Sequence, residues 1–335
     1  MTHIVLGACI GEGLAGRQLG KRALLFGALA QSIPDIDFIS ALWNDTASNL
    51  LAHRGFTHSL LFGVLATIAF ALLSEHSHKK HRLGYTQWLV FFGLEIGTHL
   101  FIDLFNSYGM GLLEPFSHQR FSFNALFVAD PFFSLWPGIA FVVLLLLLRG
   151  DRRRRWWWRF GVLGSSVYLL YCTLNKMEVS RDVEVSLHKQ QVPYKGYFTT
   201  PTPLNNWLWY VVAKDTAGYY IGFHSMFDPK EKQLELHYFA RNDSLLSGVK
   251  DHEELQHLLR FSQGYYTVEK WHDTLVFNDL RFGQIIGWYD PKEKFVFHYY
   301  LDLSDKDNRL VVQRGRFAKW NWQTTESLVK RIGSN

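Results

Sequence analysis

The stretch Phe132 to Leu148 reads FFSLWPGIAFVVLLLLL, and the basic segment Arg149 to Arg155, RGDRRRR, follows it directly. A charge-free apolar run of this kind is close to the roughly 18 to 20 residues that cross a bilayer as a helix. Other long apolar runs with almost no charge share the first half of the chain: Phe56 to Leu73, Trp88 to Phe105 and Phe160 to Leu174. Gly7 and Gly11 have a spacing that lets helices approach closely. We therefore expect an α-helical membrane bundle of about four to six membrane segments.

The second half of the chain is more polar and predicts a soluble α+β domain. Apolar and polar residues alternate in Gln233 to Phe239 and in Lys294 to Leu301, which is typical of strands. Asp251 to Phe261 has helical spacing with a plausible start at Asp251. The chain of 335 residues is long enough for two domains, which we place at 1–175 and 176–335.

The basic residues predict how the chain is oriented in a membrane. The net charge is +5, and most of the basic residues of the first half fall into three clusters: Arg17, Lys21 and Arg22; Lys79, Lys80 and Arg82; and Arg149, Arg152, Arg153, Arg154, Arg155 and Arg159. Clusters of this kind stay in the cytoplasm. The alternate segments 34–57 and 106–130 hold only Arg54 and Arg120. We expect a multi-pass protein of the bacterial inner membrane, with the C-terminal domain on the extracytoplasmic side.

The same charges have a competing interpretation as a nucleic-acid patch at Arg152 to Arg155. The flanking apolar runs favour the membrane interpretation, and we expect no nucleic-acid partner. Two cysteines, Cys9 and Cys172, do not suggest a disulfide framework. The N-terminus lacks the pattern of a cleaved signal peptide, so insertion is expected to use the apolar segments themselves.

Side chains that commonly bind metals occur at five places, which the expected topology puts at or near one membrane face. They are His3; Asp35 and Asp37; His53 and His58; His99 and Asp103; and Asp130. His99 and Asp103 stand four apart, so both project from one face of a helix. The alternative for this pair is a mutual hydrogen bond between helices. Ionisable groups in a membrane segment are costly and are usually functional or paired.

The other places are ambiguous when taken singly. Asp35 and Asp37 follow Pro34, which favours an extended backbone with both carboxylates on one side, although such pairs are often turns or caps. We expect His53 in a loop and His58 in the first turn of a helix, with Gly55 permitting the bend. Both histidines could simply be solvated, His3 could be frayed, and Asp130 could cap the helix after Pro131.

Five motifs in this order resemble the bacterial family of membrane-bound metal-dependent hydrolases, also described as LexA-binding, inner-membrane-associated hydrolases. They are Pro34-Asp-Ile-Asp37, His53-Arg-Gly-Phe-Thr-His-Ser59, His99-x-x-x-Asp103, Pro115-Phe116-Ser117 and Asp130-Pro131. The resemblance covers roughly the first 175 residues. It implies metal dependence and hydrolysis, and leaves the substrate unassigned. A looser similarity connects the His and Asp residues with zinc phospholipases C.

Imidazoles combined with carboxylates suit zinc, and manganese or magnesium would also be accepted, as one or two ions. We expect a metal-activated water to attack a phosphoester or another ester at the outer membrane face. Asp37 and Arg54 are the expected catalytic residues, and Arg54 and Arg120 are expected to bind the substrate. A membrane lipid or lipid-linked molecule would fit as substrate. The alternative is a non-catalytic metal-binding scaffold or transporter-like protein whose tail binds a protein partner.

Overall fold

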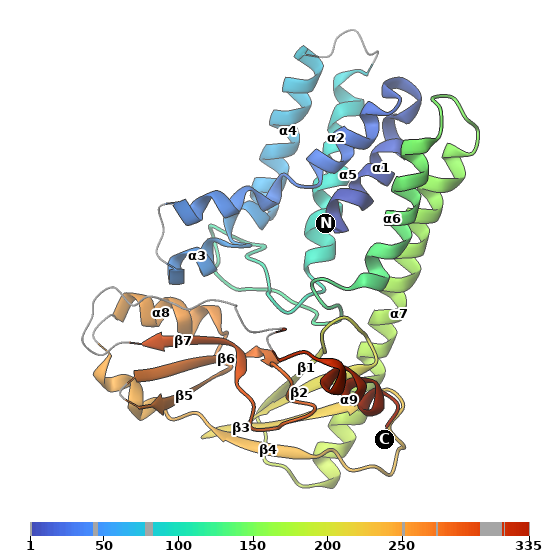
Figure 1. Ribbon diagram of the computed structural model, residues 1–335. Coiled ribbons are helices and arrows are strands. Elements are labelled where there is room, and N and C mark those ends of the chain that lie inside the picture. Colours follow the sequence, from blue (N-terminus) through green and yellow to red (C-terminus); the bar gives the residue numbers. More distant parts are fainter. Residues whose placement is uncertain are drawn as a thin grey trace. The chain divides into compact units, whose positions relative to one another are not determined.

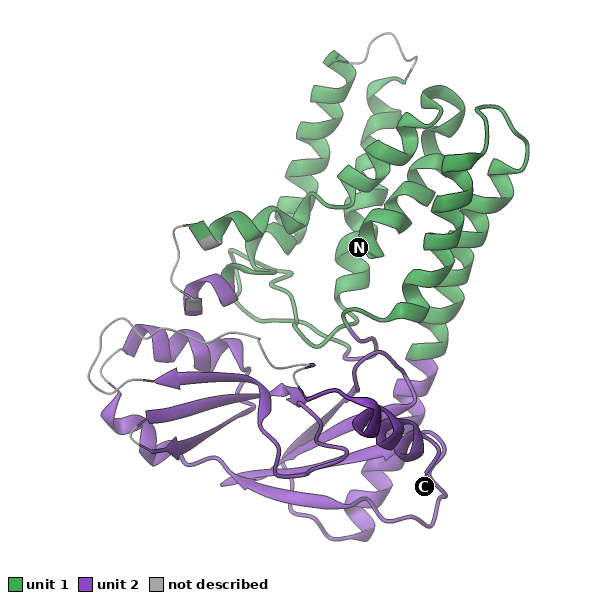
Figure 2. Ribbon diagram, in the orientation of Figure 1, with its two compact units in different colours: residues 1–42, 52–123, 128–172 green, residues 43–51, 124–127, 173–335 purple. Residues whose placement is uncertain are grey.

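A computed structural model describes residues 2–42, 46–77, 83–249, 252–272, 274–301, 317 and 319–334. These residues form two compact units (Figure 2). Unit 1 comprises residues 1–42, 52–123 and 128–172, and unit 2 comprises residues 43–51, 124–127 and 173–335. Residues 78–82, which hold one predicted basic cluster, and Asp251 lie outside the described residues.

Unit 1 is built from helices (Figure 1). Its elements in chain order are α1 (Thr2–Leu19), α2 (Arg22–Ala30), the 3-10 helices η1 (Pro34–Leu42) and η2 (Phe56–His58), α4 (Leu60–Ser77), α5 (Tyr85–Asp103), α6 (Pro131–Leu146) and the first part of α7 (Arg154–Lys189). The core between α4 and α5 is aromatic: Trp88 is fully buried, and its ring stacks on Phe92 at 5.9 Å.

Glycines bring α1 and α2 into backbone contact. A Cβ atom on Gly7 would lie 2.5 Å from the carbonyl oxygen of Gly27, and one on Gly11 would lie 2.4 Å from that of Ala23. A Cβ on Gly27 would lie 2.1 Å from the carbonyl oxygen of Gly7. No larger residue fits these positions without moving a helix, so the predicted close approach at Gly7 and Gly11 is confirmed.

The expected bundle of four to six membrane segments followed by a soluble α+β domain is wrong as a description of the fold. Among the described residues, one helix, α4, is long and apolar enough to cross a membrane. A second span exists only if Arg22–Ala30 and Pro34–Ser40, bent by 57°, count as one. None of the other three predicted runs qualifies: α6 has only 16 residues, Phe160 to Leu174 is the middle of a 36-residue helix with charged ends, and α5, which holds most of Trp88 to Phe105, is not a candidate span.

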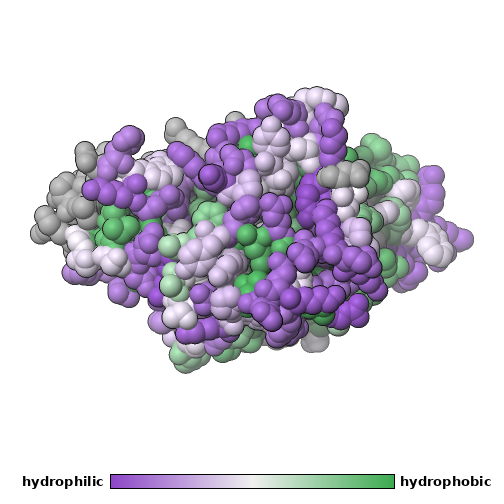
Figure 3. Space-filling model, turned by 90° about the horizontal axis from the view of Figure 1, so that it is seen from below, coloured by the Kyte–Doolittle hydropathy of each residue, from purple (hydrophilic) through white to green (hydrophobic). Residues whose placement is uncertain are grey.

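The surface of α4 differs from that of a core helix in a water-soluble protein. Only 22% of its residues are buried, and Leu60, Val64, Leu65 and Leu73 are each more than half exposed. Other parts of the surface are polar: the face shown in Figure 3 is mostly hydrophilic, with small apolar clusters. An exposed apolar helix of this length suits contact with lipid.

A buried ion pair joins the first and last helices of unit 1. Arg154 Nε and Nη2 donate to the two carboxylate oxygens of Glu12, at 2.7 and 2.6 Å. Nη1 of the same guanidinium donates to the carbonyl oxygens of Leu144 and Leu147 at the end of α6. One arginine therefore holds the ends of α1, α6 and α7 together.

Unit 2 contains two antiparallel sheets. The first has the order β1-β2-β3-β4, with strands Gly196–Pro201, Leu208–Lys214, Gly218–Ser225 and Leu236–Ala240; the second has the order β5-β6-β7, with strands Tyr266–Trp271, Thr274–Gln284 and Phe295–Leu301. Its helices are α3 (Thr46–Ala52, all but the last residue), the 3-10 helix η4 (Asp243–Gly248), α8 (His252–Phe261) and α9 (Trp322–Ile332). The predicted strand at Lys294 to Leu301 is confirmed as β7, whereas β4 lies three residues later than the predicted start at Gln233.

Strand β2 is buried on both of its faces. Trp209, Val211 and Ala213 belong to a core cluster with Val179, Val183 and Leu187 of α7. The alternate residues Tyr210 and Val212 pack with Leu280 and Phe295 of the other sheet. Because side chains alternate along a strand, one continuous apolar run can fill two cores.

The carboxylate of Asp228 fixes α9 to the loop after β3. It accepts hydrogen bonds from both Nη atoms of Arg331 at 2.9 Å, from the Ser225 amide at 2.8 Å and from the Ser334 hydroxyl at 2.7 Å. Burial raises the pKa of this carboxyl, but Arg331 and the Ser225 amide outweigh it and hold the pKa below its usual range.

We expect Asp228→Asn to destabilise the docking of α9 near neutral pH, by about 2 kcal/mol for charged hydrogen bonds of this kind. An acid pKa that falls on folding contributes stability above its unfolded value of about 4, and that contribution disappears as the pH drops through the folded pKa. The difference in hydrogen-exchange protection of α9 between wild type and variant should therefore be large at pH 7 and shrink below pH ~4. A difference that is independent of pH would contradict this role.

Candidate metal centre

Four helical elements of unit 1 and the turn after α3 bring seven of the predicted ligand residues together. His3 lies in the first turn of α1, Asp35 and Asp37 in η1, His58 at the end of η2, and His99 and Asp103 in the last turns of α5; His53 follows α3. The predicted extended backbone at Asp35 and Asp37 is wrong, because both residues lie in a 3-10 helix. His58 precedes α4, whose first turn is capped by the Ser59 hydroxyl accepting from the Phe62 amide.

The imidazoles of His58 and His99 point their Nε2 atoms at each other. His99 Nδ1 lies 2.6 Å from the carbonyl oxygen of Gln31, and because a carbonyl only accepts, Nδ1 carries the proton. His58 Nδ1 lies 3.2 Å from the Thr57 hydroxyl and 3.5 Å from Asp37 Oδ2. The two Nε2 atoms are 3.2 Å apart. Two lone pairs cannot face each other at this distance, so a proton or a cation must lie between them.

Two carboxylates complete the arrangement. Asp35 Oδ1 lies 3.6 Å from Nε2 of both His58 and His99, and Asp103 Oδ2 lies 3.5 and 3.7 Å from the same two atoms. Ligand atoms about 2.1 Å from a tetrahedral zinc are about 3.4 Å apart. Asp35 Oδ1 and the two Nε2 atoms lie within 4.8 Å of one another and could hold one small cation, with Asp103 Oδ2 close to both Nε2 atoms. Asp103 Oδ2 is buried and accepts no hydrogen bond from the described residues, although Arg54 Nη2 lies 3.3 Å from it as an ion-pair partner.

His3 extends the cluster on the other side of Asp103. Its Nε2 lies 3.2 Å from Asp103 Oδ1, and its ring stacks on His99 with 4.0 Å between centroids. His3, His99 and Asp103 form a second group of possible ligand atoms, all within 4.8 Å of one another. Asp103 Oδ1 thus faces His3 while its Oδ2 faces His58 and His99, an arrangement that would suit either one ion with a positioned His3 or two ions that share a carboxylate.

Asp37 and His53 lie behind His58. Asp37 Oδ2 accepts from the Arg54 amide at 2.7 Å and lies 3.2 Å from His53 Nδ1. A carboxylate behind a ligand histidine fixes the ring and makes its other nitrogen a better donor. This position favours an orienting role for Asp37 over the predicted role as a catalytic group. His53 is the more exposed of the two histidines, at 41%.

Arg54 closes the cluster from the side of the loop. Its backbone has a positive φ of 59°, and it is held there by bonds from its amide to Asp37 and from the Gly111 amide to its carbonyl oxygen. Its Nη2 lies 3.3 Å from Asp103 Oδ2, Nη1 donates to Asn106 Oδ1, and the guanidinium covers the ring of Tyr108 at 4.9 Å. Asn106, Tyr108 and the Gln31 carbonyl were not predicted. Asn106 and Tyr108 could have been found from the sequence, because they lie in the turn directly after His99-x-x-x-Asp103.

Burial and neighbouring charges shift the pKa values of the cluster residues in different directions. Burial raises the pKa of Asp103, but Arg54 and His3 outweigh it and hold the pKa well below its usual range. Burial lowers the pKa of His58, but the Asp103 and Asp35 carboxylates outweigh it, and the net shift is upward. Burial and His3 lower the pKa of His99 to about 3. The opposite directions of the two pKa shifts favour His58 over His99 as the carrier of a proton between the two Nε2 atoms.

Two predicted residues lie outside this cluster. Asp130 caps α6: its Oδ1 accepts from the amides of Phe132 and Phe133, and its Oδ2 accepts from the Tyr168 hydroxyl. Arg120 is buried, and its guanidinium donates to the carbonyl oxygens of Gly109 and His53. Asp130 is thus placed as a helix cap, and Arg120 as a brace for the loop that carries His53.

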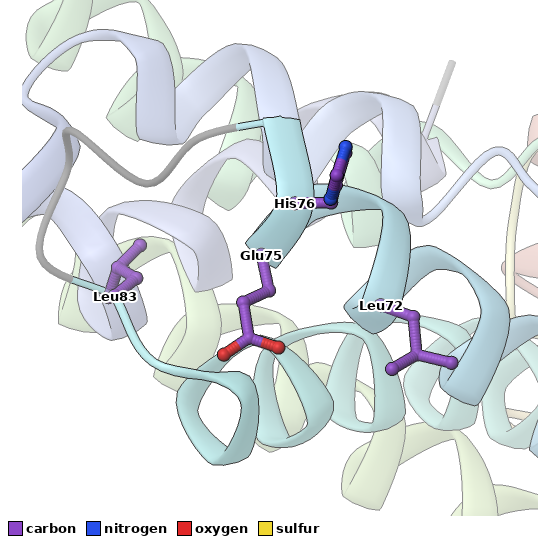
Figure 4. A pocket seen from close by; sticks show the side chains of 4 residues that line it. All are labelled: Leu72, Glu75, His76 and Leu83. Atoms are coloured by element: carbon purple, nitrogen blue, oxygen red, sulfur yellow. The ribbon is translucent and has the colours of Figure 1, made fainter.

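A separate pocket of about 670 Å³ lies at the end of α4 and is lined by Leu72, Glu75, His76 and Leu83 (Figure 4). Glu75 and His76 point in different directions there. A helix of 18 residues is about 27 Å long. The pocket therefore lies at the opposite end of α4 from His58 and is not part of the metal-ligand cluster.

Comparisons with known proteins give the chain a family. The inner membrane protein YbcI of Escherichia coli (strain K12) is 29% identical over 123 residues, which are 36% of this chain and 69% of that protein. The uncharacterised protein YfhP of Bacillus subtilis (strain 168) is 29% identical over 167 residues, which are 43% of this chain and 49% of that protein. The chain therefore spans about half the length of YfhP. No solved structure matches the chain.

A family model described as YdjM inner membrane protein matches residues 1–179. This range is more than half of the chain and includes every residue of the cluster described above. The family name supports a location at the bacterial inner membrane, in agreement with the exposed apolar surface of α4. The chain belongs to the YdjM inner membrane protein family.

Proposed function

We propose that the chain is a metal-dependent hydrolase of the inner membrane, with a divalent cation held by Asp35, His58, His99 and Asp103. The convergence of the two Nε2 atoms, each on a ring whose Nδ1 faces an acceptor, carries the proposal. Zinc suits two imidazoles and two carboxylates, and manganese or magnesium are alternatives. When bound, such a cation lowers the pKa of a water molecule and stabilises negative charge on an ester.

The residues around the cation would divide the remaining work. Asp37 and the Gln31 carbonyl hold the two imidazoles, and Arg54 balances the charge of Asp103. The Nε atom of Arg54 is buried and has no partner among the described residues, so it is left to bind a phosphoryl oxygen. The side chain of Asp35 is 44% exposed. The cluster is thus open on the side of η1, as a catalytic site requires and a closed structural site does not.

We further propose a phosphoester of a membrane lipid or lipid-linked molecule as substrate. The cluster lies beside η1, where Ile36, Phe38 and Ile39 are exposed and apolar. A substrate with an acyl chain would find both an apolar surface and a cationic group there. In this proposal the cluster and unit 2 face the extracytoplasmic side, and unit 2 is available to a protein partner.

The test is hydrolysis of bis(p-nitrophenyl) phosphate and of phosphatidylglycerol vesicles by the full chain in detergent. We expect turnover that a chelator abolishes and that added zinc or manganese restores. Asp35→Asn should lose most of the activity, whereas His118→Ala, an exposed histidine outside the cluster, should keep it. Stoichiometric metal without turnover of either substrate would overturn hydrolysis of phosphoesters and favour the metal-binding scaffold.

A further inference from the structure

A basic cavity lies at the other end of unit 1, where α1 ends and α7 begins. Its volume is about 820 Å³, and its lining includes six arginines and two carboxylates. The arginines are Arg17 of α1, Arg149 and Arg152 of the α6–α7 loop, and Arg154, Arg155 and Arg159 of α7. All of these residues belong to unit 1.

Internal ion pairs neutralise only part of this charge. Glu12 forms an ion pair with the buried Arg154, and Asp151 forms one with Arg153 at 2.8 Å. Arg149 donates one hydrogen bond, to the carbonyl oxygen of Gln18. In the part of the chain that the structure describes, the other five arginines of the lining make no ion pair with a carboxylate. Five exposed guanidinium groups around one cavity predict a ligand with concentrated negative charge.

The neighbours of the cavity indicate what kind of anion it takes. Arg155 and Arg159 lie over the ring of Trp156 at 5.4 and 5.9 Å, and Arg159 also lies over Trp158 at 5.4 Å. Leu146 and Leu148, shortly before Arg149 in the chain, and Leu163, one helical turn after Arg159, are 76%, 78% and 61% exposed. Tryptophan and arginine beside exposed leucines are typical of the level at which lipid headgroups meet acyl chains.

We propose that this cavity binds the phosphate of an anionic phospholipid headgroup, with the acyl chains against the exposed apolar residues of α6 and α7. Bidentate contacts from guanidinium groups suit a phosphodiester. A free phosphate would use the arginines but leave the leucines exposed, and RNA would likewise leave the apolar surface uncovered. Clusters of basic residues beside apolar surface are a recurrent solution for anionic headgroups.

The test is retention of lipid by the full chain, measured by native mass spectrometry from detergent with phosphatidylcholine, phosphatidylglycerol or cardiolipin. We expect retention of the two anionic lipids and not of phosphatidylcholine. The triple variant R17Q/R152Q/R155Q should bind phosphatidylglycerol about 100-fold more weakly, since each basic residue contributes about fivefold near a membrane surface. R17K/R152K/R155K should bind between wild type and the glutamine variant, because lysine keeps the charge but cannot make the bidentate contacts.

The matched control removes the same charge elsewhere. Lys189, Lys195 and Lys230 are exposed residues of unit 2, and K189Q/K195Q/K230Q should bind phosphatidylglycerol like wild type. Equal binding by the arginine triple variant and this control would overturn the proposal. Retention of inorganic phosphate or of a single-stranded RNA as tightly as phosphatidylglycerol, with loss in the arginine variant, would assign the cavity to that ligand and overturn the lipid.

Discussion

Replacement of His99 by alanine is expected to reduce bound metal by more than about tenfold. Losing a residue that only orients a ligand already lowers metal affinity about 10- to 100-fold, so losing a ligand nitrogen should cost at least as much. His99 contributes the Nε2 atom that lies within 3.2 to 3.7 Å of His58, Asp35 and Asp103. The measurement is metal stoichiometry of the purified full chain by elemental analysis.

The design includes graded controls. His58→Ala should match His99→Ala, and His53→Ala, which affects the cluster only through Asp37, should have a smaller effect. His118, whose side chain is 62% exposed, provides a histidine outside the cluster, and His118→Ala should bind metal like wild type. Wild-type metal content in His99→Ala would show that the ion is held elsewhere in the protein.

Replacement of Arg154 by methionine is expected to be the most destabilising single change at a charged residue of unit 1. Breaking a buried ion pair by removing one partner costs about 3–5 kcal/mol, because the other charge stays buried and unpaired. Here the uncompensated group is Glu12, and the carbonyl oxygens of Leu144 and Leu147 also lose their donor. Thermal unfolding of the full chain in detergent should show a midpoint lower by roughly 10 °C.

Two further variants separate the causes. Arg153→Met removes the exposed neighbour that pairs with Asp151 and should leave the midpoint almost unchanged. Arg154→Met/Glu12→Met removes both charges and should recover much of the stability lost in the single variant. A double variant as unstable as Arg154→Met would mean that the carbonyl contacts, and not the ion pair, hold the helix ends together.

Much of the candidate site was predictable because its ligands are polar residues in an apolar context. His99 and Asp103 share one helix face by their spacing alone, and the remaining residues were grouped by the expected side of the membrane. The roles within the group were not predictable. Asp37 lies behind His58 because a 3-10 helix, not a strand, follows Pro34, and the acceptor for His99 is a backbone carbonyl, which no side-chain pattern reveals.

The fold was predicted less well because apolar runs do not state where helices begin and end. Phe160 to Leu174 has the hydropathy of a separate segment, yet α7 continues through polar residues on both sides, to Lys189. Its C-terminal part turns Val179, Val183 and Leu187 to the sheet of unit 2. Packing against a partner that is distant in sequence thus decides the length of this helix, and local composition cannot show it.

The glycine contacts between α1 and α2 turn the first two helices into a single rigid hairpin. His3 at the start of α1 and the Gln31 carbonyl after α2 both lie at the open end of this hairpin, where each contacts the ring of His99. Both groups are therefore set in one register by Gly7, Gly11 and Gly27. One residue inserted between His3 and Gly7 would rotate His3 by about 100° around the helix axis, so the number of residues between them is itself part of the site.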